Sequence, residues 1–239
     1  MFFSILYYGS MIILIPGIIF SIYASIRVKT TFNRYNRVST QGGSSAKTAA
    51  EILLFKNNCH VNIARVSGQL TDNYNPSNGT LSLSDSTYNS NSVAAVAVAA
   101  HEVGHVVQHQ EEYVPLKIRT ALVPVVNIGS RLALPVAILG VIIEWLSATG
   151  NFGSILISIG IILYSLASIF ALVTLPVEIN ASRRAKRMLL DNGLITQSES
   201  KQVGSVLYAA ALTYFASLLV SLLYLLRFII LIASVRRKD

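Results

Sequence analysis

Long apolar stretches alternate with one extended polar segment along this chain of 239 residues. A bilayer core about 30 Å thick is crossed by roughly 20 helical residues. Three uncharged stretches reach that length, at 1–26, 145–177 and 202–226. A fourth apolar stretch, 132–148, is shorter and contains one acid. The segment between Arg27 and Arg119 is polar and carries charges of both signs. The pattern predicts a mainly α-helical membrane protein with about four transmembrane helices and one soluble module.

The polar segment shows short helical and strand patterns. Apolar residues recur at helical spacing from Ala46 to about Lys56, whereas 61–66 and 81–83 alternate as strands do. The run 75–79, Asn-Pro-Ser-Asn-Gly, has strong turn chemistry. We therefore expect a small β element, whose exposed strand edge would accept an extended peptide.

A second helix of the soluble module is expected from Ser92 to His109. One of Ser90, Asn91 and Ser92 caps its first turn, and residues 94–100 are apolar without a polar interruption. Apolar groups on all sides indicate a helix buried in protein. Its uncharged part is too short to cross a membrane.

Composition and charge agree with a membrane protein. Hydrophobic residues make up 53% of the chain and charged residues only 13%, outside the usual soluble balance. The net charge of +8 comes from basic residues that cluster at the ends of apolar spans, without one patch interleaved with aromatic side chains. Membrane flanking explains this charge better than nucleic-acid binding does.

The second helix carries His101-Glu102-Val103-Gly104-His105, which matches the H-E-x-x-H pattern of zinc proteases. Imidazoles four residues apart lie one above the other on a helix face, so both can reach one tetrahedral ion. Glu102 is rotated by about 100° from His101, which places its carboxylate beside the metal. We expect one Zn²⁺ ion bound by His101 and His105, with Glu102 as the catalytic base for a water molecule.

Two histidines do not complete such a site. Position 111 is Glu, so the third histidine of the metzincin pattern is missing. Glu178 is the most suggestive third ligand, because it ends the long uncharged run and heads an apolar helical stripe. Its alternative role is to complement the positive end of a helix. His109 is expected to be a polar or supporting residue, although it could supply a fourth ligand.

Four strings of this sequence resemble the YugP-type family of neutral zinc metallopeptidases. They are Gly68-Gln69-Leu70-Thr71-Asp72-Asn73-Tyr74-Asn75-Pro76, Leu81-Ser82-Leu83-Ser84, Ser92-Val93-Ala94-Ala95 through Ala99-Ala100-His101-Glu102-Val103-Gly104-His105, and Leu175-Pro176-Val177-Glu178-Ile179-Asn180-Ala181-Ser182-Arg183-Arg184. The similarity extends over essentially the whole chain, and its motifs are specific. It departs at Asn73 and Asn75, where the family usually has His and Asp, so any role of those positions in binding substrate or a second ion is open.

The family is bacterial, membrane-bound and assigned to the gluzincin-like proteases. The resemblance implies a zincin-like α+β catalytic module that contains the small β element. It also implies metal ligands at His101, His105 and Glu178 and a catalytic Glu102. The physiological substrate stays undefined, and Tyr113, His109 and Asn180 are candidates for stabilising an oxyanion.

The sequence as a whole predicts a membrane-bound zinc metallopeptidase that hydrolyses peptide bonds through a zinc-activated water. The partners would be a peptide or protein substrate and the lipid bilayer, without nucleic acid. The expected parts are an N-terminal anchor, a catalytic module, a transmembrane hairpin, a helix carrying the third ligand, and a C-terminal transmembrane helix with a basic tail: 1–26, 27–120, 121–177, 178–203 and 204–239.

Two other functions are compatible with these features. A non-catalytic zinc-binding membrane scaffold or assembly partner would normally close its metal site with four protein ligands. A transporter would place ionisable groups inside the spans, as Arg131 and Glu144 partly do. Both lie near the ends of a short span, where snorkelling to the interface accounts for them.

The membrane topology follows from the expected site. His105 and Glu178 can share an ion only if an even number of spans separates them, and 132–148 and about 152–174, joined by a turn at 149–151, supply two. Basic residues follow both the first span and Glu178, which by the positive-inside tendency places the site on the cytoplasmic side. The basic tail at 236–238 opposes this orientation, because a fourth span would send it outside.

Overall fold

The computed structural model describes residues 9–146 and 151–236. The expected turn at Thr149 and Gly150 and the tail residues Arg237 and Lys238 lie outside the described residues. Two compact units are formed, each from segments that are distant in sequence. The helical unit comprises described parts of 1–23, 118–175 and 214–239, and the mixed unit comprises 24–117 and 176–213.

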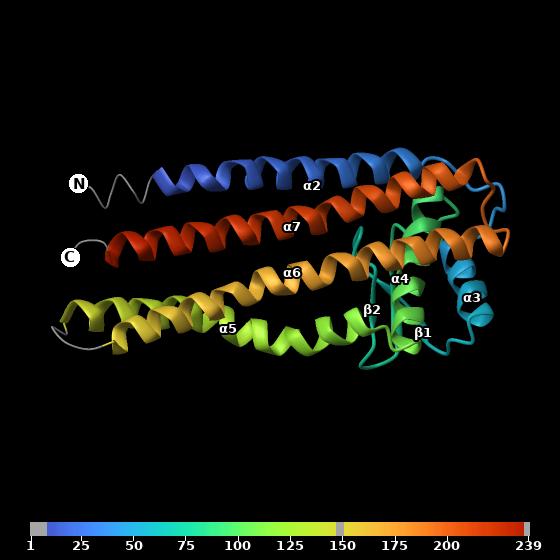
Figure 1. The fold of residues 1–239 in the computed structure, drawn as a ribbon. Coiled ribbons are helices and arrows are strands. Elements are labelled where there is room, and N and C mark those ends of the chain that lie inside the picture. The colour runs from blue at the N-terminus through green and yellow to red at the C-terminus, as the bar shows by residue number, and fades with distance from the viewer. Residues whose placement is uncertain (1–8, 147–150, 237–239) are drawn as a thin grey trace. The chain divides into compact units, whose positions relative to one another are not determined.

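Four long apolar helices supply the helical unit and continue into the mixed unit (Figure 1). They are α2 (Ile15–Tyr35, after a 3-10 turn at Ile12–Leu14), α5 (Val114–Leu146), α6 (Phe152–Asp191) and α7 (Glu199–Arg236). Each is long and apolar enough to cross a membrane, in agreement with the four spans expected from the sequence. Because 40 residues of helix extend about 60 Å, only the uncharged part of α6 is needed to span, and Glu178 lies beyond it.

Small residues bring α5 and α6 together within the helical unit. A β-carbon added at Gly140 would lie 2.8 Å from the Gly153 carbonyl oxygen, and one at Gly160 would lie 2.7 Å from the β-carbon of Ala137. Close packing of this kind holds membrane helices together where lipid removes the hydrophobic driving force. The α5–α6 pair is therefore built as a tight hairpin.

The mixed unit contains two further helices and a small sheet. Helix α3 (Ala46–Lys56) has the expected bounds, and the Ser45 side chain caps it by accepting from Thr48 N. Helix α4 (Val93–Gln110) begins where Ser92 accepts from Ala95 N, which selects Ser92 among the three expected caps. The strands are β1 (Asn62–Val66), β2 (Asn73–Asn75) and β3 (Thr80–Ser84).

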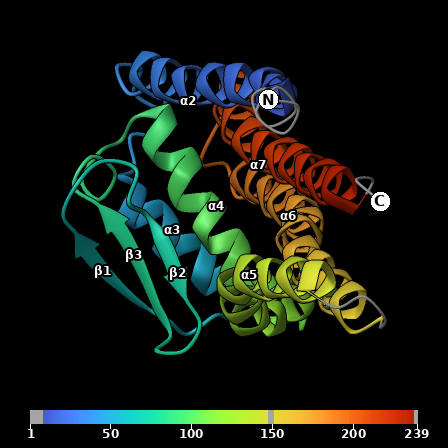
Figure 2. The ribbon, with the colours of Figure 1, turned by 90° about the vertical axis from the view of Figure 1, so that its left-hand side faces the viewer.

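The sheet is mixed, in the order β1–β3–β2, with β1 parallel and β2 antiparallel to β3. The turn predicted from residues 75–79 is confirmed, because residues 76–79 form a turn that connects β2 to β3. The short strand β2 was not expected. It has only one apolar residue, Tyr74, between two asparagines, and so it shows no strand-like alternation of apolar and polar residues. The strand contacts α4, so the sheet edge beside the motif helix is β2 (Figure 2).

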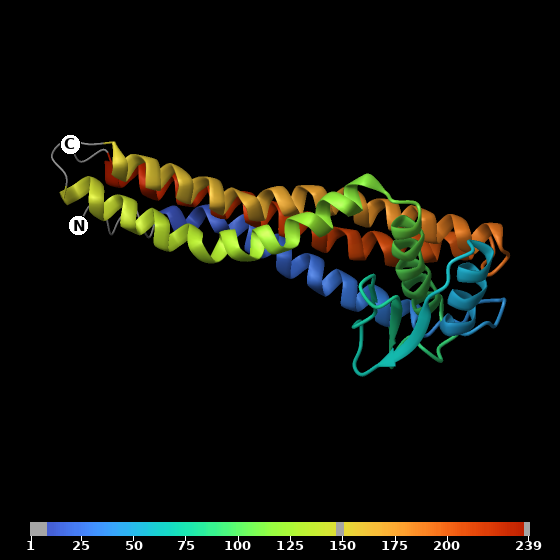
Figure 3. The ribbon, with the colours of Figure 1, turned by 90° about the horizontal axis from the view of Figure 1, so that it is seen from below.

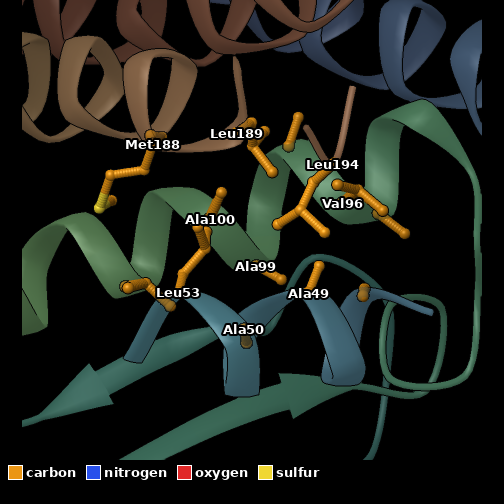
Figure 4. Close-up of a cluster of buried hydrophobic side chains, with 14 of the residues drawn as sticks. Ala49, Ala50, Leu53, Val96, Ala99, Ala100, Met188, Leu189 and Leu194 are labelled. Atoms are coloured by element: carbon orange, nitrogen blue, oxygen red, sulfur yellow. The ribbon is translucent and has the colours of Figure 1, made fainter. Parts of the chain in front are cut away.

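Alanines make the core of the mixed unit compact. Ala49, Ala50 and Leu53 of α3 face the Ala99–Ala100 side of α4, as Figure 4 shows. Leu189 of α6 and Leu194 close the same cluster, and all of these side chains are buried. Because alanine side chains are small, α3 and α6 can pack closely against opposite sides of α4. This close packing fixes the position of α4.

The structure corrects the expected start of the helix that carries Glu178. Glu178 does not head a helix, because α6 passes through Pro176 and Glu178 without a break; the alternative of a charge complementing a helix N-terminus is therefore wrong. Helix α5 begins at Val114 and α7 at Glu199, so both begin before the apolar stretches 132–148 and 202–226. Hydropathy detects only the apolar part of a helix, and exposed charged residues do not end one.

Candidate metal centre

The candidate site lies where α4 runs across the part of α6 that belongs to the mixed unit (Figure 3). Helix α4 presents His101 and His105 one turn apart on one face. Between them is Gly104, which lies against the backbone of Ala181. Because no side chain separates the helices here, the histidines reach Glu178, 77 and 73 positions further along the chain.

Three ligand atoms converge at this crossing. The Nε2 atom of His101 lies 3.2 Å from Glu178 Oε2, and the Nε2 atom of His105 lies 3.4 Å from the same oxygen. All three atoms lie within 4.8 Å of one another. The structure thus brings together the three residues expected to bind the metal.

The distance from each histidine to Glu178 fits zinc. With bonds of 2.0–2.2 Å, two ligands of a tetrahedral zinc ion are separated by about 3.3 Å, close to the 3.2 and 3.4 Å between the two Nε2 atoms and Glu178 Oε2. Two imidazole nitrogens and one carboxylate oxygen are also a donor set that zinc prefers. Among the described residues, the group of His, Cys, Asp or Glu side chains found close enough to share an ion is His101, His105 and Glu178.

The electrostatics of the site favour a bound cation. The Glu178 side chain is 2% exposed and both histidine side chains are 12% exposed. Burial alone would raise the pKa of Glu178, but its hydrogen bonds with His101 and His105 lower that pKa well below its usual range. A buried carboxylate that stays ionised requires such positive or hydrogen-bonding partners.

Glu102 is buried beside the cluster. Burial raises the pKa of its carboxyl group, and the opposing effects of His101 and His105 do not cancel that rise. A carboxylate with a raised pKa is a stronger proton acceptor at neutral pH than an ordinary one. Its environment therefore suits the predicted base, whose catalytic role remains a prediction.

Each histidine also has a partner at its other ring nitrogen. The Ser182 hydroxyl lies 3.2 Å from His101 Nδ1, and Gln108 Oε1 lies 3.0 Å from His105 Nδ1. Such contacts orient metal-binding imidazoles. No motif or spacing in the sequence singled out Gln108. Its signal was a polar side chain one turn after His105, at a position where the helix is otherwise apolar.

The other sequence candidates lie around this cluster. His109 is exposed, and its Nδ1 lies 3.1 Å from the Tyr74 hydroxyl of β2. Tyr113 packs its ring against the Arg184 guanidinium at 6.0 Å, whereas Asn180 Oδ1 accepts from Gln108 and Arg184. None of the three belongs to the converging set of donors. Their proposed oxyanion roles remain predictions.

The two positions that depart from the family pattern are both exposed on β2. Asn73 donates to the Thr71 carbonyl, and Asn75 accepts from Ser77 N. Both side chains thus support the turns that flank the strand. These contacts leave the converging His–His–Glu set unaffected.

Comparison with known sequences agrees with this geometry. A family model described as "putative neutral zinc metallopeptidase" matches residues 10–233. The chain belongs to this family. The resemblance inferred from its motifs is thereby confirmed, and membership of a zinc peptidase family implies zinc as the metal and a peptide as the substrate.

A curated relative supports the same assignment. The chain is 42% identical over 221 residues to "Putative membrane protease YugP" of Bacillus subtilis (strain 168). The aligned region covers 92% of this chain and 94% of the relative. No solved structure gives a significant match. The relative's name and the four apolar helices agree on a membrane protein.

Proposed function

We propose that this protein hydrolyses peptide bonds as a membrane-bound metallopeptidase with one zinc ion. The observation that carries the proposal is the convergence of His101 Nε2, His105 Nε2 and Glu178 Oε2, with Glu102 adjacent in the same helix. A buried set of two imidazoles and one carboxylate, with a further buried acid beside it, has the parts of a catalytic zinc site.

The residues of the chain have separable tasks in this reaction. His101 and His105 present Nε2 lone pairs, and Glu178 contributes negative charge through Oε2. Bound zinc would acidify a water molecule and polarise the carbonyl of the scissile peptide. Glu102 would accept the proton of the attacking water on its carboxylate and then donate it to the nitrogen of the leaving amine.

The number of ligands favours catalysis over a scaffold role. Structural zinc sites are normally closed by four protein ligands, whereas catalytic sites use three and leave one position open. The residue that could supply a fourth is His109, which pairs with Tyr74 instead of joining the cluster. The His–His–Glu set also supports a zincin-like, gluzincin-type assignment of the mixed unit.

Strand β2 is the proposed docking edge for the substrate. It forms one edge of the described sheet, pairs only with β3 there, and contacts α4. An extended peptide can add to such an edge through main-chain hydrogen bonds. The Tyr74–His109 contact links this strand to the helix that carries the motif. The substrate would thus be a segment able to adopt an extended conformation.

The proposed orientation places the site on the cytoplasmic side of the cell membrane. The spans of α5 and α6 would return the chain to the side that it left, so that the motif and Glu178 meet. The basic residues after the first span and after Glu178 favour the cytoplasm.

Zinc analysis and proteolysis of a denatured protein such as casein test the proposal. The purified full chain in detergent should contain one zinc ion and cleave casein. Glu102→Gln should retain zinc, because Glu102 is not a ligand, and lose at least about 100-fold in rate through loss of the base. Glu112→Gln, an exposed acid just beyond the same helix, is the matched control and should remain active. Zinc binding without cleavage by wild type would favour the scaffold function, and full activity of Glu102→Gln would refute the mechanism.

A further inference from the structure

Gln108 is a fully buried polar side chain on α4 that the proposed reaction does not use. Its amide nitrogen lies 2.9 Å from the Val177 carbonyl oxygen and 2.9 Å from Asn180 Oδ1. Its amide oxygen lies 3.0 Å from His105 Nδ1. One side chain therefore joins a histidine of the motif to the backbone immediately before Glu178.

The acceptors on α6 fix the orientation of this amide. A backbone carbonyl oxygen can only accept a hydrogen bond, so the Gln108 NH₂ group must face Val177. The Asn180 oxygen is fixed in turn, because it accepts from Arg184 Nε at 2.8 Å and a guanidinium is only a donor. If the Gln108 amide were flipped, its oxygen would face the Val177 carbonyl oxygen and Asn180 Oδ1. Neither of these atoms could donate a hydrogen bond to it.

The orientation of Gln108 determines which nitrogen of His105 carries the proton. Since Gln108 Oε1 can only accept, Nδ1 of His105 must donate and keeps its proton; the proton that His105 releases when a metal binds is therefore the one on Nε2, which faces Glu178. The partner of His101 is less restrictive, because the Ser182 hydroxyl can donate or accept. Of the two ring contacts, the one at His105 is thus the one that dictates a tautomer.

We propose that Gln108 is a positioning residue that selects the Nε2-binding form of His105 and holds this imidazole in register with Glu178. The inference rests on the proposed zinc site, to which it adds the device that organises two ligands before the ion binds. Partners of this kind commonly contribute about 10- to 100-fold to metal affinity. Gln108 would act through His105 and Glu178 without touching the metal or the substrate.

Zinc affinity, measured by competition with a chromophoric chelator on the full chain in detergent, tests this role. Gln108→Met preserves volume but removes the acceptor and both donors, and it should bind zinc about 10- to 100-fold more weakly. Gln108→Glu should bind zinc no better than Gln108→Met, because its second oxygen would face the two acceptors on α6. Equal affinity of wild type and Gln108→Met would overturn the proposal.

A packing control separates positioning from general stability. Leu189→Ala empties a buried position on α6 about 16 Å along the helix from Glu178. It should lower the melting temperature while leaving zinc affinity within about twofold of wild type. If it weakened zinc as much as Gln108→Met for a similar loss of stability, the role of Gln108 would be structural only.

A measurement on the unmodified chain covers the case in which the Gln108 variants do not fold. In ¹⁵N-histidine NMR spectra of the zinc-loaded protein, His105 should show a metal-bound Nε2 and a protonated, slowly exchanging Nδ1. A metal-bound Nδ1 would overturn the inference. Failure of the wild-type chain to bind zinc would instead refute the proposed function, so the two failures are distinguishable.

Discussion

A β-carbon placed on Gly104 would lie only 2.7 Å from the carbonyl oxygen of Ala181, closer than real β-carbons approach any atom. The α-carbon of Ala181 would be 3.2 Å away, so the obstacle is backbone and not a flexible side chain. Backbone contact between α4 and α6 thus occurs within the motif, one residue before His105. The distance from the histidines to Glu178 depends on that contact.

Gly104→Ala should force α4 and α6 apart. We expect a loss of about 1–3 kcal/mol in the free energy of unfolding, as for other overpacked sites, together with weaker zinc binding. Gly204→Ala is the matched control, because the nearest atom to its added methyl group is Lys186 Nζ at 3.6 Å. Alanine there should stabilise the helix by up to about 1 kcal/mol. Thermal unfolding and chelator competition would measure both effects, and unchanged zinc affinity in Gly104→Ala would contradict the prediction.

Replacing Glu178 by Ala should reduce zinc affinity and peptidase activity together. The side chain supplies the single oxygen that both histidines approach, and its loss leaves the ion with two protein ligands. Zinc content after dialysis and casein cleavage would be measured in parallel. Glu111→Ala removes a more exposed acid, paired with Arg184, and serves as the control. Full zinc content in Glu178→Ala would assign the third ligand to another residue.

The start of α7 should make stability sensitive to acid. The Glu199 carboxylate accepts backbone hydrogen bonds from Thr196 and Gln41, and the Thr196 hydroxyl accepts in return from Glu199 N, as in a capping box. Burial would raise the pKa of Glu199, but these hydrogen bonds lower it below its ordinary 4.5. Because the folded pKa is depressed, the stabilisation is present above the unfolded pKa and is lost as the pH falls through the folded value.

Glu199→Gln should therefore be less stable than wild type by about 1 kcal/mol at pH 7. The difference should shrink below about pH 4.5, where the unfolded carboxyl begins to bind its proton. Melting temperatures of both metal-free proteins between pH 7 and pH 3 would show this, since chelation removes the separate effect of zinc release. A difference that stays constant over this range would contradict the assignment.

Single cysteines can establish the membrane orientation. In a Cys59→Ser background, Asn89→Cys and Ser198→Cys probe exposed positions of the mixed unit, and Asn151→Cys probes the start of α6. A membrane-impermeant thiol reagent on intact cells should label position 151 alone if the site faces the cytoplasm. Labelling at 89 and 198 without 151 would invert the topology. Different labelling of 89 and 198 would refute the site shared by the motif and Glu178.

The sequence by itself determined the features that depend on neighbouring residues. The four spans follow from uncharged length and α3 from apolar spacing, whereas the sequence narrowed the cap of α4 only to Ser90, Asn91 or Ser92. The two histidines of the motif share a face because the helix repeats every 3.6 residues. In each case the information is contained within one element, where the position of a residue fixes the direction of its side chain.

Only the tertiary structure decided how separate elements meet. The sequence named Glu178, but its approach to the histidines required α4 and α6 to cross at Gly104. No local pattern identified Gln108 as a partner of Val177, because the two are 69 positions apart. Likewise, hydropathy could not show that α6 continues past Pro176 into the mixed unit. Periodicity records which side of one segment avoids water, whereas the identity of the atoms that cover that side depends on how the whole chain packs.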